Sequence, residues 1–265
     1  MFGNPINQSK SPFIHRQFAK SLGEQLEYDA ILAPVDGFAD SWQQFVAAGG
    51  KGGNVTVPFK EQAYQLADVL SERARQAGAV NTLYIDSEGK LCGDNTDGLG
   101  LVADLLRLNV DLMGITVLLL GAGGASRGVI GPLLAAGVSQ IVLANRTPGK
   151  AEAIASQFDK VVACGYDDIP QLSYSLIINA TSSGLTGERP DIPPIHLKSC
   201  LLAYDMLYGK EPTAFLCWAK AHGVRQCADG LGMLVAQAAE AFYIWRGKRP
   251  ETTEVLAQLS RQLSA

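Results

Sequence analysis

An apolar segment that runs into a glycine-rich turn is the feature that most constrains the fold of this 265-residue chain. Residues 115–126 read ITVLLLGAGGAS, and a helical pattern continues over 125–136. Small residues let the backbone approach a phosphate, and free N–H groups at a helix N-terminus face the anion. The sequence therefore predicts a strand, a turn and a helix that bind the pyrophosphate of a dinucleotide. A purely structural glycine turn is the alternative.

Apolar runs alternate with helical patterns from residue 115 onward, which is typical of a doubly wound, dinucleotide-binding Rossmann fold. The proline-rich segment 188–194 predicts a loop in place of one crossover helix. The expected strands are 115–120, 140–144, 161–163, 175–180, 201–206 and 224–227, and the expected helices are 125–136, 149–158 and 212–222.

Because the glycine turn lies near residue 120, a separate α/β domain precedes it, and we expect this domain to bind the substrate. Two apolar helices, 231–245 and 251–263, should pack back on it because their faces need cover. We predict a substrate-binding domain of residues 1–97 completed by 231–265, and a cofactor domain of 98–230. The expected strands of the substrate-binding domain are 28–33, 54–57 and 80–85, and its expected helices are 12–21, 38–48 and 60–77.

Composition excludes several classes of protein. A net charge of −4 gives no field that would attract nucleic acid or anionic lipid, and no apolar run reaches the ~20 residues that span a bilayer. The N-terminal residues have neither the basic start nor the apolar core of a signal peptide. Five cysteines without C-x-x-C spacing and three histidines argue against a metal site. We expect a cytoplasmic globular protein.

Polar clusters in the first hundred residues are candidate binding sites. Ser9 and Ser11 precede a helical pattern, so they cap this helix or, together, bind a small carboxylate. Asn54 and Thr56 alternate with valines and should present an amide and a hydroxyl on one face of a strand. Lys60 follows at the start of the next helix, where the helix dipole disfavours a cation. A residue placed against such a local preference is typical of a functional site.

Two further clusters are less specific. Asn81 opens an apolar strand, where a turn role is equally plausible. The segment 93–98, GDNTDG, lacks the bidentate acid of an EF-hand loop, so a calcium site is not expected. Asp97 precedes an apolar helical pattern and is predicted to cap a helix at the mouth of a cleft.

The residues after the second strand of the predicted Rossmann fold select the cofactor. NAD enzymes usually place an acid ~20 residues after the glycines, where it binds the ribose 2′-hydroxyl. This chain instead has Asn145, Arg146 and Thr147, with Lys150 shortly after. A guanidinium matches a 2′-phosphate in geometry and charge, so Arg146 favours NADP over its alternative role as a solvated loop residue.

Nine motifs follow one another along the chain: SKSP, NVTVPFK, GAVNT, GDNTDG, GAGGAS, NRT, NATSSG, YDMxY and DGLGMLVAQ. This is their order in shikimate dehydrogenases, and the chain resembles this family over essentially its whole length. The resemblance implies a small shikimate-binding domain, an NADP-binding Rossmann domain and a cleft that closes between them. It also implies the reversible NADPH-dependent reduction of 3-dehydroshikimate to shikimate, in chorismate and aromatic amino-acid biosynthesis.

The resemblance also implies roles for single residues. Lys60 would be the catalytic acid/base, with Asp97 beside it. Ser9, Ser11 and Tyr208 would bind the substrate carboxylate, and Asn54, Thr56, Asn81, Asp97 and Gln237 the ring hydroxyls. The cofactor-binding residues would be Gly121, Ala122, Gly123, Gly124, Ala125, Ser126, Asn145, Arg146, Thr147, Lys150, Thr181, Met206, Gly230 and, as a weaker contact, Glu72.

Two other functions remain open on the sequence. A quinate/shikimate dehydrogenase that prefers NAD would carry an acid where Arg146 stands. A nucleotide-sensing protein without activity would have lost the pair Lys60 and Asp97. Relatives begin with a short apolar strand before FGNP, so we expect this strand to be shortened here or to start upstream. We expect a monomer or homodimer.

Overall fold

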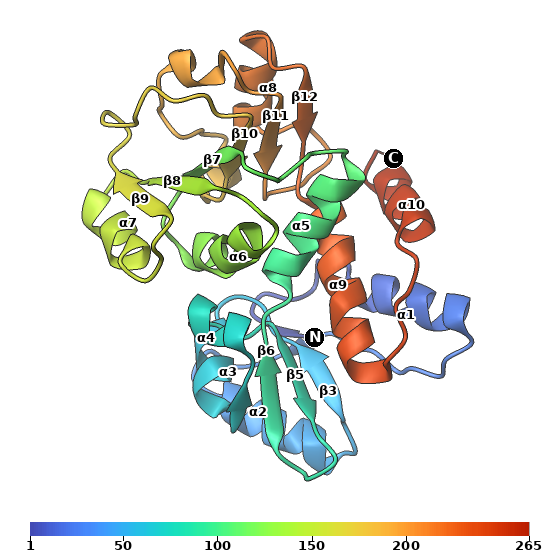
Figure 1. Cartoon of the computed structure of the whole chain (residues 1–265). Helices are drawn as coiled ribbons and strands as arrows, with labels where there is room; N and C mark the ends of the chain where they lie inside the picture. The colour runs from blue at the N-terminus through green and yellow to red at the C-terminus, as the bar shows by residue number, and fades with distance from the viewer. Residues whose placement is uncertain (265) are drawn as a thin grey trace.

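Two adjacent helices, α5 (Asp97–Arg107) and α9 (Leu231–Arg246), run between the two α/β halves of the protein (Figure 1). The computed structural model describes residues 1–264. Within these residues, no helix is both long enough and apolar enough to cross a membrane. The two halves meet along these helices, and a cavity lined by polar side chains lies there.

The second half contains a six-stranded parallel sheet in the order β12-β11-β10-β7-β8-β9. The first strand, β7, is central, and the chain winds outward from it in both directions. This order confirms the predicted doubly wound fold, whose ligands bind where the winding direction reverses, here between β7 and β10. The strands are β7 (Thr116–Leu120), β8 (Gln140–Ala144), β9 (Val161–Cys164), β10 (Leu176–Asn179), β11 (Leu202–Asp205) and β12 (Gln226–Ala228).

Apolar runs form these strands because helices or loops cover both faces of the sheet. Alternate residues of β7 enter different cores: Leu119 packs with α6 (Gly124–Ala135) and α7 (Pro148–Ala155), whereas Leu118 packs with α8 (Ala214–Ala221). A strand buried on both faces reads as continuously apolar, which is why the four inner strands β7, β8, β10 and β11 were predictable. Two 3₁₀ turns, η1 (Ser183–Thr186) and η2 (Pro194–Leu197), take the place of one crossover helix, near the predicted loop.

The first half contains a mixed four-stranded sheet and a two-stranded parallel sheet, joined by a bridge between Phe2 and Val55. Helices α2 (Phe38–Ala47), α3 (Lys60–Leu66) and α4 (Glu72–Ala77) pack against these sheets, whereas α1 (Ser11–Leu22) lies beside α9. The C-terminal helix α10 (Thr253–Ser264) packs with α1 and α9, as expected. The strands are β1 (Phe2–Gly3), β2 (Ile31–Leu32), β3 (Gly52–Asn54), β4 (Val69–Leu70), β5 (Thr82–Ile85) and β6 (Leu91–Asp94).

Secondary structure in this half differs from the prediction at several places, and strand β6 was not predicted at all. The helix expected over 60–77 is interrupted by β4, which pairs with β6, and Ser71 then caps α4 by accepting a hydrogen bond from the Ala74 N–H. The strand expected over 54–57 ends at Asn54, so Thr56 does not continue its face. Asp97 is the first helical residue of α5 rather than its cap.

Helices α5 and α9 approach closely because each places a glycine against the other. A Cβ on Gly100 would lie 2.6 Å from Cβ of Gln237, and a Cβ on Gly232 would lie 1.9 Å from Oδ1 of Asp104. Asp104 is 1% exposed. Its carboxylate accepts hydrogen bonds from Tyr204 Oη at 2.7 Å and Arg107 Nε at 2.8 Å. The contact between the helices is therefore rigid as well as close.

We expect Gly232→Ala to lower the free energy of unfolding by about 2 kcal/mol or more, because Asp104 is held and cannot move aside for the added methyl group. Urea unfolding followed by circular dichroism measures this loss. The matched control is Gly149→Ala on α7, where a Cβ would meet nothing within 4 Å. Equal stability of the two variants would contradict the close contact.

Candidate active site

A cavity of about 160 Å³ lies where α1, α3, α5 and α9 converge on the ends of β3 and β5. The polar residues that line it were all predicted to bind substrate or to catalyse, and they come from parts of the chain up to 226 positions apart, Ser11 to Gln237. They are Ser11, Asn54, Thr56, Lys60, Asn81, Asp97, Tyr208 and Gln237, with Met206 and Gly230 at the side of the cofactor half.

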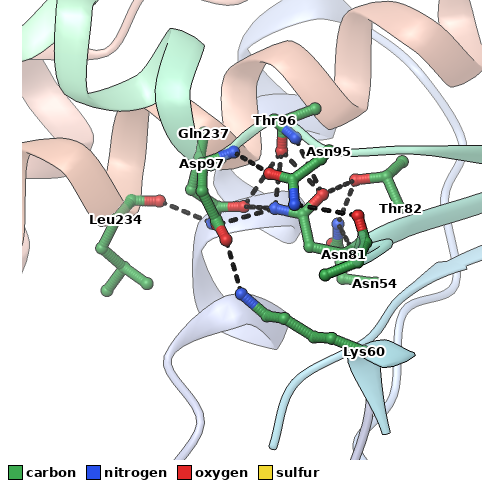
Figure 2. Close-up of polar contacts among 10 residues, drawn as sticks. Asn54, Lys60, Asn81, Thr82, Asn95, Thr96, Asp97, Leu234 and Gln237 are labelled. Atoms are coloured by element: carbon green, nitrogen blue, oxygen red, sulfur yellow. Dashed lines mark hydrogen bonds and ion pairs between the residues drawn. The ribbon is translucent and has the colours of Figure 1, made fainter. Parts of the chain in front are cut away.

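Lys60 and Asp97 form an ion pair in the wall of this cavity, with Nζ 2.5 Å from Oδ2 (Figure 2). Each is the first residue of its helix, α3 and α5 respectively. The helix dipole favours the carboxylate of Asp97 and disfavours the ammonium of Lys60, which the carboxylate compensates. Both side chains keep some exposure, 29% and 16%, so the pair remains accessible from the cavity.

Asn81 links this ion pair to the body of the protein. Its Oδ1 accepts a hydrogen bond from the Thr96 N–H at 2.9 Å, and its Nδ2 donates to Asp97 Oδ1 at 2.8 Å (Figure 2). The same nitrogen lies 3.4 Å from Gln237 Oε1. One oxygen of Asp97 is therefore held by Asn81 while the other faces Lys60.

Asn54 is buried beside Asn81, and its polar atoms already have partners in the protein. Tyr28 Oη donates to Asn54 Oδ1 at 2.6 Å, and Asn54 Nδ2 donates to Thr82 Oγ1 and to the carbonyl of Asn81. Behind Tyr28 lies the fully buried His15, whose ring stacks on that of Tyr28 with centroids 4.3 Å apart. A buried aromatic layer therefore supports this side of the cavity.

The two predicted serines have different environments. Ser11 is buried and lines the cavity, whereas Ser9 is not among the lining residues. Oγ of Ser9 accepts a hydrogen bond from the Ser11 N–H at 3.3 Å. The N-cap of α1 is Lys10, which makes no side-chain capping bond. Ser9 thus stabilises the turn before α1 and orients the backbone next to Ser11.

The glycine-rich turn lies at the carboxyl end of β7, as predicted. Gly121 has φ +101°, which favours glycine, and a Cβ there would lie 2.9 Å from Thr181 Cγ2. A Cβ on Gly123 or Gly124 would meet nothing within 4 Å, so α6 begins facing open space. Ser126 Oγ donates to the Gly121 carbonyl and closes the turn. This open cradle at a helix N-terminus fits a pyrophosphate.

Several further predicted cofactor residues follow other strands of the Rossmann sheet. Asn145 Oδ1 accepts a hydrogen bond from the Ala122 N–H at 3.1 Å, and Asn145 Nδ2 donates to the Thr147 carbonyl. Arg146 and Lys150 are exposed on the following loop and helix. Gly230 contacts Met206, because a Cβ on it would lie 2.1 Å from the Met206 carbonyl oxygen.

Glu72 lies elsewhere, on α4. It is exposed and interacts with Arg75 and Gln76. It does not line the cavity.

Sequence reasoning missed several residues of the site. Met233 and Leu234 line the cavity one turn before Gln237 on α9, and helical spacing from Gln237 would have identified them. Tyr28, Thr82 and Thr96 hold the asparagines from behind the cavity. Thr82 and Thr96 stand next to predicted site residues, but the sequence contains no signal that singles out Tyr28.

Family models match three segments of the chain. Residues 1–83 match the "Shikimate dehydrogenase substrate binding domain", and residues 104–186 match "Shikimate / quinate 5-dehydrogenase". Residues 230–259 match the "Shikimate 5'-dehydrogenase C-terminal domain". The three segments together cover parts of both α/β halves and the whole of α9.

Whole-chain comparisons agree with these matches. The shikimate dehydrogenase (NADP(+)) of Shewanella halifaxensis is 54% identical over 270 residues, which cover 99% of this chain and 95% of that protein. The crystal structure of an enzyme from Pseudomonas putida has a TM-score of 0.94 at 45% identity, and covers 98% of this chain and 96% of its own.

A third similar protein was solved with ligands. Shikimate 5-dehydrogenase from Thermus thermophilus, in complex with NADP(H) and shikimate, has a TM-score of 0.87 at 34% identity. The alignment covers 99% of this chain and 97% of that one.

His15 makes stability depend on pH. Burial lowers the pKa of His15 from 6.5 to about 3, so the folded protein keeps the ring neutral in a range where the unfolded chain binds a proton. Because the unfolded state binds more protons there, stability falls as pH drops. We expect the buried, neutral His15 to lower the free energy of unfolding by about 2 kcal/mol between pH 7 and pH 5.

Urea unfolding of the wild type and of His15→Leu at these two pH values measures this cost. The variant should lose less stability than the wild type on acidification. Parallel pH dependences would show that His15 does not titrate on unfolding.

Proposed function

Because the chain belongs to the shikimate dehydrogenase family and is an NADP-dependent oxidoreductase, we propose that it reversibly reduces 3-dehydroshikimate to shikimate, with Lys60 and Asp97 as its acid/base pair. The observation that carries the proposal is the 2.5 Å contact of Lys60 with Asp97 in the wall of a polar cavity. This activity belongs to the synthesis of aromatic amino-acid precursors, and we place it in the cytoplasm.

Lys60 donates the proton in the reduction and accepts it in the reverse reaction. Bound NADPH supplies a hydride to the ring carbonyl of the substrate. The developing oxyanion is stabilised by the ammonium of Lys60, which donates a proton to it and completes the hydroxyl group. Asp97 keeps Nζ pointing into the cavity through the step. In the reverse direction, the neutral amine of Lys60 takes the proton back from the hydroxyl group.

The remaining polar side chains recognise the substrate. Ser9, Ser11 and Tyr208 bind its carboxylate, and the ring hydroxyls are bound by residues on the opposite wall. A site built from hydrogen-bonding groups rejects analogues that lack a hydroxyl, because its own groups would be left unpaired. The residues proposed for the ring hydroxyls are Asn54, Thr56, Asn81, Asp97 and Gln237.

Residues at the carboxyl ends of the Rossmann strands would hold the cofactor. The open turn at Gly123 and Gly124 would bind the pyrophosphate, and Arg146 with Lys150 would bind the 2′-phosphate. Met206 and Gly230 line the substrate cavity from the cofactor half, so they would contact the nicotinamide. The other proposed contacts are Glu72, Gly121, Ala122, Ala125, Ser126, Asn145, Thr147 and Thr181.

The two halves correspond to two functional domains. Residues 1–97 with 231–265 form the substrate domain, and residues 98–230 form the cofactor domain. Hydride transfer requires the nicotinamide and the carbonyl in near contact, so closure of the cleft contributes to the rate.

Lys60→Ala tests the acid/base assignment. We expect kcat to fall by ~10²–10⁴, the usual scale of general acid–base catalysis, with little change in the KM for shikimate. Steady-state NADP⁺ reduction at saturating shikimate measures it, and Lys90→Ala, an exposed lysine beside β6, is the control. Near-normal turnover of Lys60→Ala would remove Lys60 from the mechanism.

Arg146→Asp tests the cofactor assignment. A carboxylate at this exposed position repels a 2′-phosphate, so we expect the KM for NADP⁺ to rise at least tenfold more than the KM for NAD⁺. Arg225→Asp, at the amino end of β12, is the control because it lies away from the cofactor edge of the sheet. Equal losses with both cofactors would refute the 2′-phosphate site. Parallel assays with quinate test the NAD-preferring alternative.

A further inference from the structure

The hydrogen bonds behind the cavity run in one direction, and Asp97 sets that direction. An ionised carboxylate only accepts hydrogen bonds. Asn81 must therefore turn its amide nitrogen toward Asp97, 2.8 Å away. Its carbonyl oxygen then faces Thr82 Oγ1 at 2.8 Å and the backbone nitrogen of Thr96 at 2.9 Å (Figure 2).

The hydroxyl of Thr82 donates in the same direction, toward Asn81 and Asp97. Oδ1 of Asn81 only accepts, so the single hydroxyl proton of Thr82 points to it. The oxygen of Thr82 is then left to accept from Asn54 Nδ2, 3.1 Å away. This turns the carbonyl of Asn54 toward Tyr28, whose hydroxyl donates at 2.6 Å. Each side chain in this series of hydrogen bonds, from Tyr28 to Asp97, thus has one allowed orientation.

Thr82 acts without reaching the substrate. Its side chain is fully buried and does not line the cavity, whereas Asn81 and Asp97 do. Asn54 and Asn81 are each 3% exposed, so solvent does not replace a bond that either loses. The hydroxyl of Thr82 is therefore the buried group that joins the two amides.

We propose that Thr82 is a positioning residue for the acid/base pair: its hydroxyl holds the Asn81 amide on Asp97 Oδ1, so that Oδ2 stays on Lys60. The inference rests on the proposed roles of Lys60 and Asp97. Without this hydroxyl, Asn81 keeps its contacts with the backbone N–H and the hydroxyl of Thr96 but loses the short bond to Thr82 that restrains its amide plane from the other side. Asp97 then holds Lys60 in the reactive orientation for a smaller fraction of the time.

Two substitutions at Thr82 separate its hydroxyl from its shape. Thr82→Val keeps the volume and removes the hydroxyl, whereas Thr82→Ser keeps the hydroxyl and removes a methyl group. We expect Thr82→Val to lower kcat by about tenfold and Thr82→Ser by less than about twofold, on the scale of one buried hydrogen bond. The KM for NADP⁺, which reports on the other half, should stay unchanged in both.

A purely structural role predicts a different pattern. If packing matters, Thr82→Ser loses as much activity as Thr82→Val, and the loss follows the thermal unfolding midpoint. That result, or wild-type kcat in Thr82→Val, would overturn the proposal. If Thr82→Val does not fold, Tyr28→Phe interrupts the same chain further back. A fall in kcat of about threefold supports the proposal, and an unchanged kcat contradicts it.

A double-mutant cycle tests whether Thr82 acts through Asp97. Once Asp97→Asn has removed the carboxylate, adding Thr82→Val should lower kcat no further. A full multiplicative loss would show that Thr82 acts elsewhere. The two proposals fail separately: an active Lys60→Ala refutes the acid/base assignment, whereas an inactive Lys60→Ala with a fully active Thr82→Val refutes only the positioning role.

Discussion

The buried carboxylate of Asp104 is the constraint on which the geometry of the cleft depends. It accepts hydrogen bonds from Tyr204 on β11 and from Arg107 on its own helix, and it touches Gly232 on α9. A buried charge is tolerated only where such donors satisfy it. In return, it fixes α5 to the Rossmann sheet and brings α9 into contact with α5. Because α5 begins at the site and α9 passes along it, this one group sets where both helices place their functional side chains.

The ion pair of Lys60 and Asp97 depends on this contact between α5 and α9, although Lys60 belongs to the other half of the molecule. Asp97 opens α5, and Gln237 lies on α9 opposite Gly100, whose lack of a side chain permits the approach. Lys60 comes from α3 and meets them from the opposite side. A shift of either long helix would therefore change the distance between Lys60 and Asp97. The Rossmann half thus contributes to the geometry of the ion pair that we propose as the site of proton transfer.

Secondary structure was easier to predict from the sequence in the Rossmann half than in the first half. Strands buried on both faces of a parallel sheet give long apolar runs, so the four inner strands and the turn at Gly121 were predictable. In the first half, β1 and β4 have only two residues each, too few to show a period. The contact between Lys60 and Asp97 joins residues 37 positions apart, and only the family resemblance indicated it. Tyr28 and Thr82 read as ordinary core and strand residues, since their role lies in a hydrogen-bond direction that no pattern encodes.

The lengths of the hydrogen bonds divide the site into a fixed part and an adjustable part. Asn81, Asp97 and Lys60 are joined by bonds of 2.8 and 2.5 Å, with directions set by an acceptor-only carboxylate. Gln237 Oε1, in contrast, lies 3.4 Å from both Asn81 Nδ2 and Thr96 Oγ1, distances at which hydrogen bonds are weak. A ring hydroxyl can displace these long contacts at little cost, whereas displacing Asn81 from Asp97 would disrupt the pair. In the proposed function, Gln237 therefore adjusts to the substrate, while Asn81 keeps Asp97 in the orientation that holds Lys60.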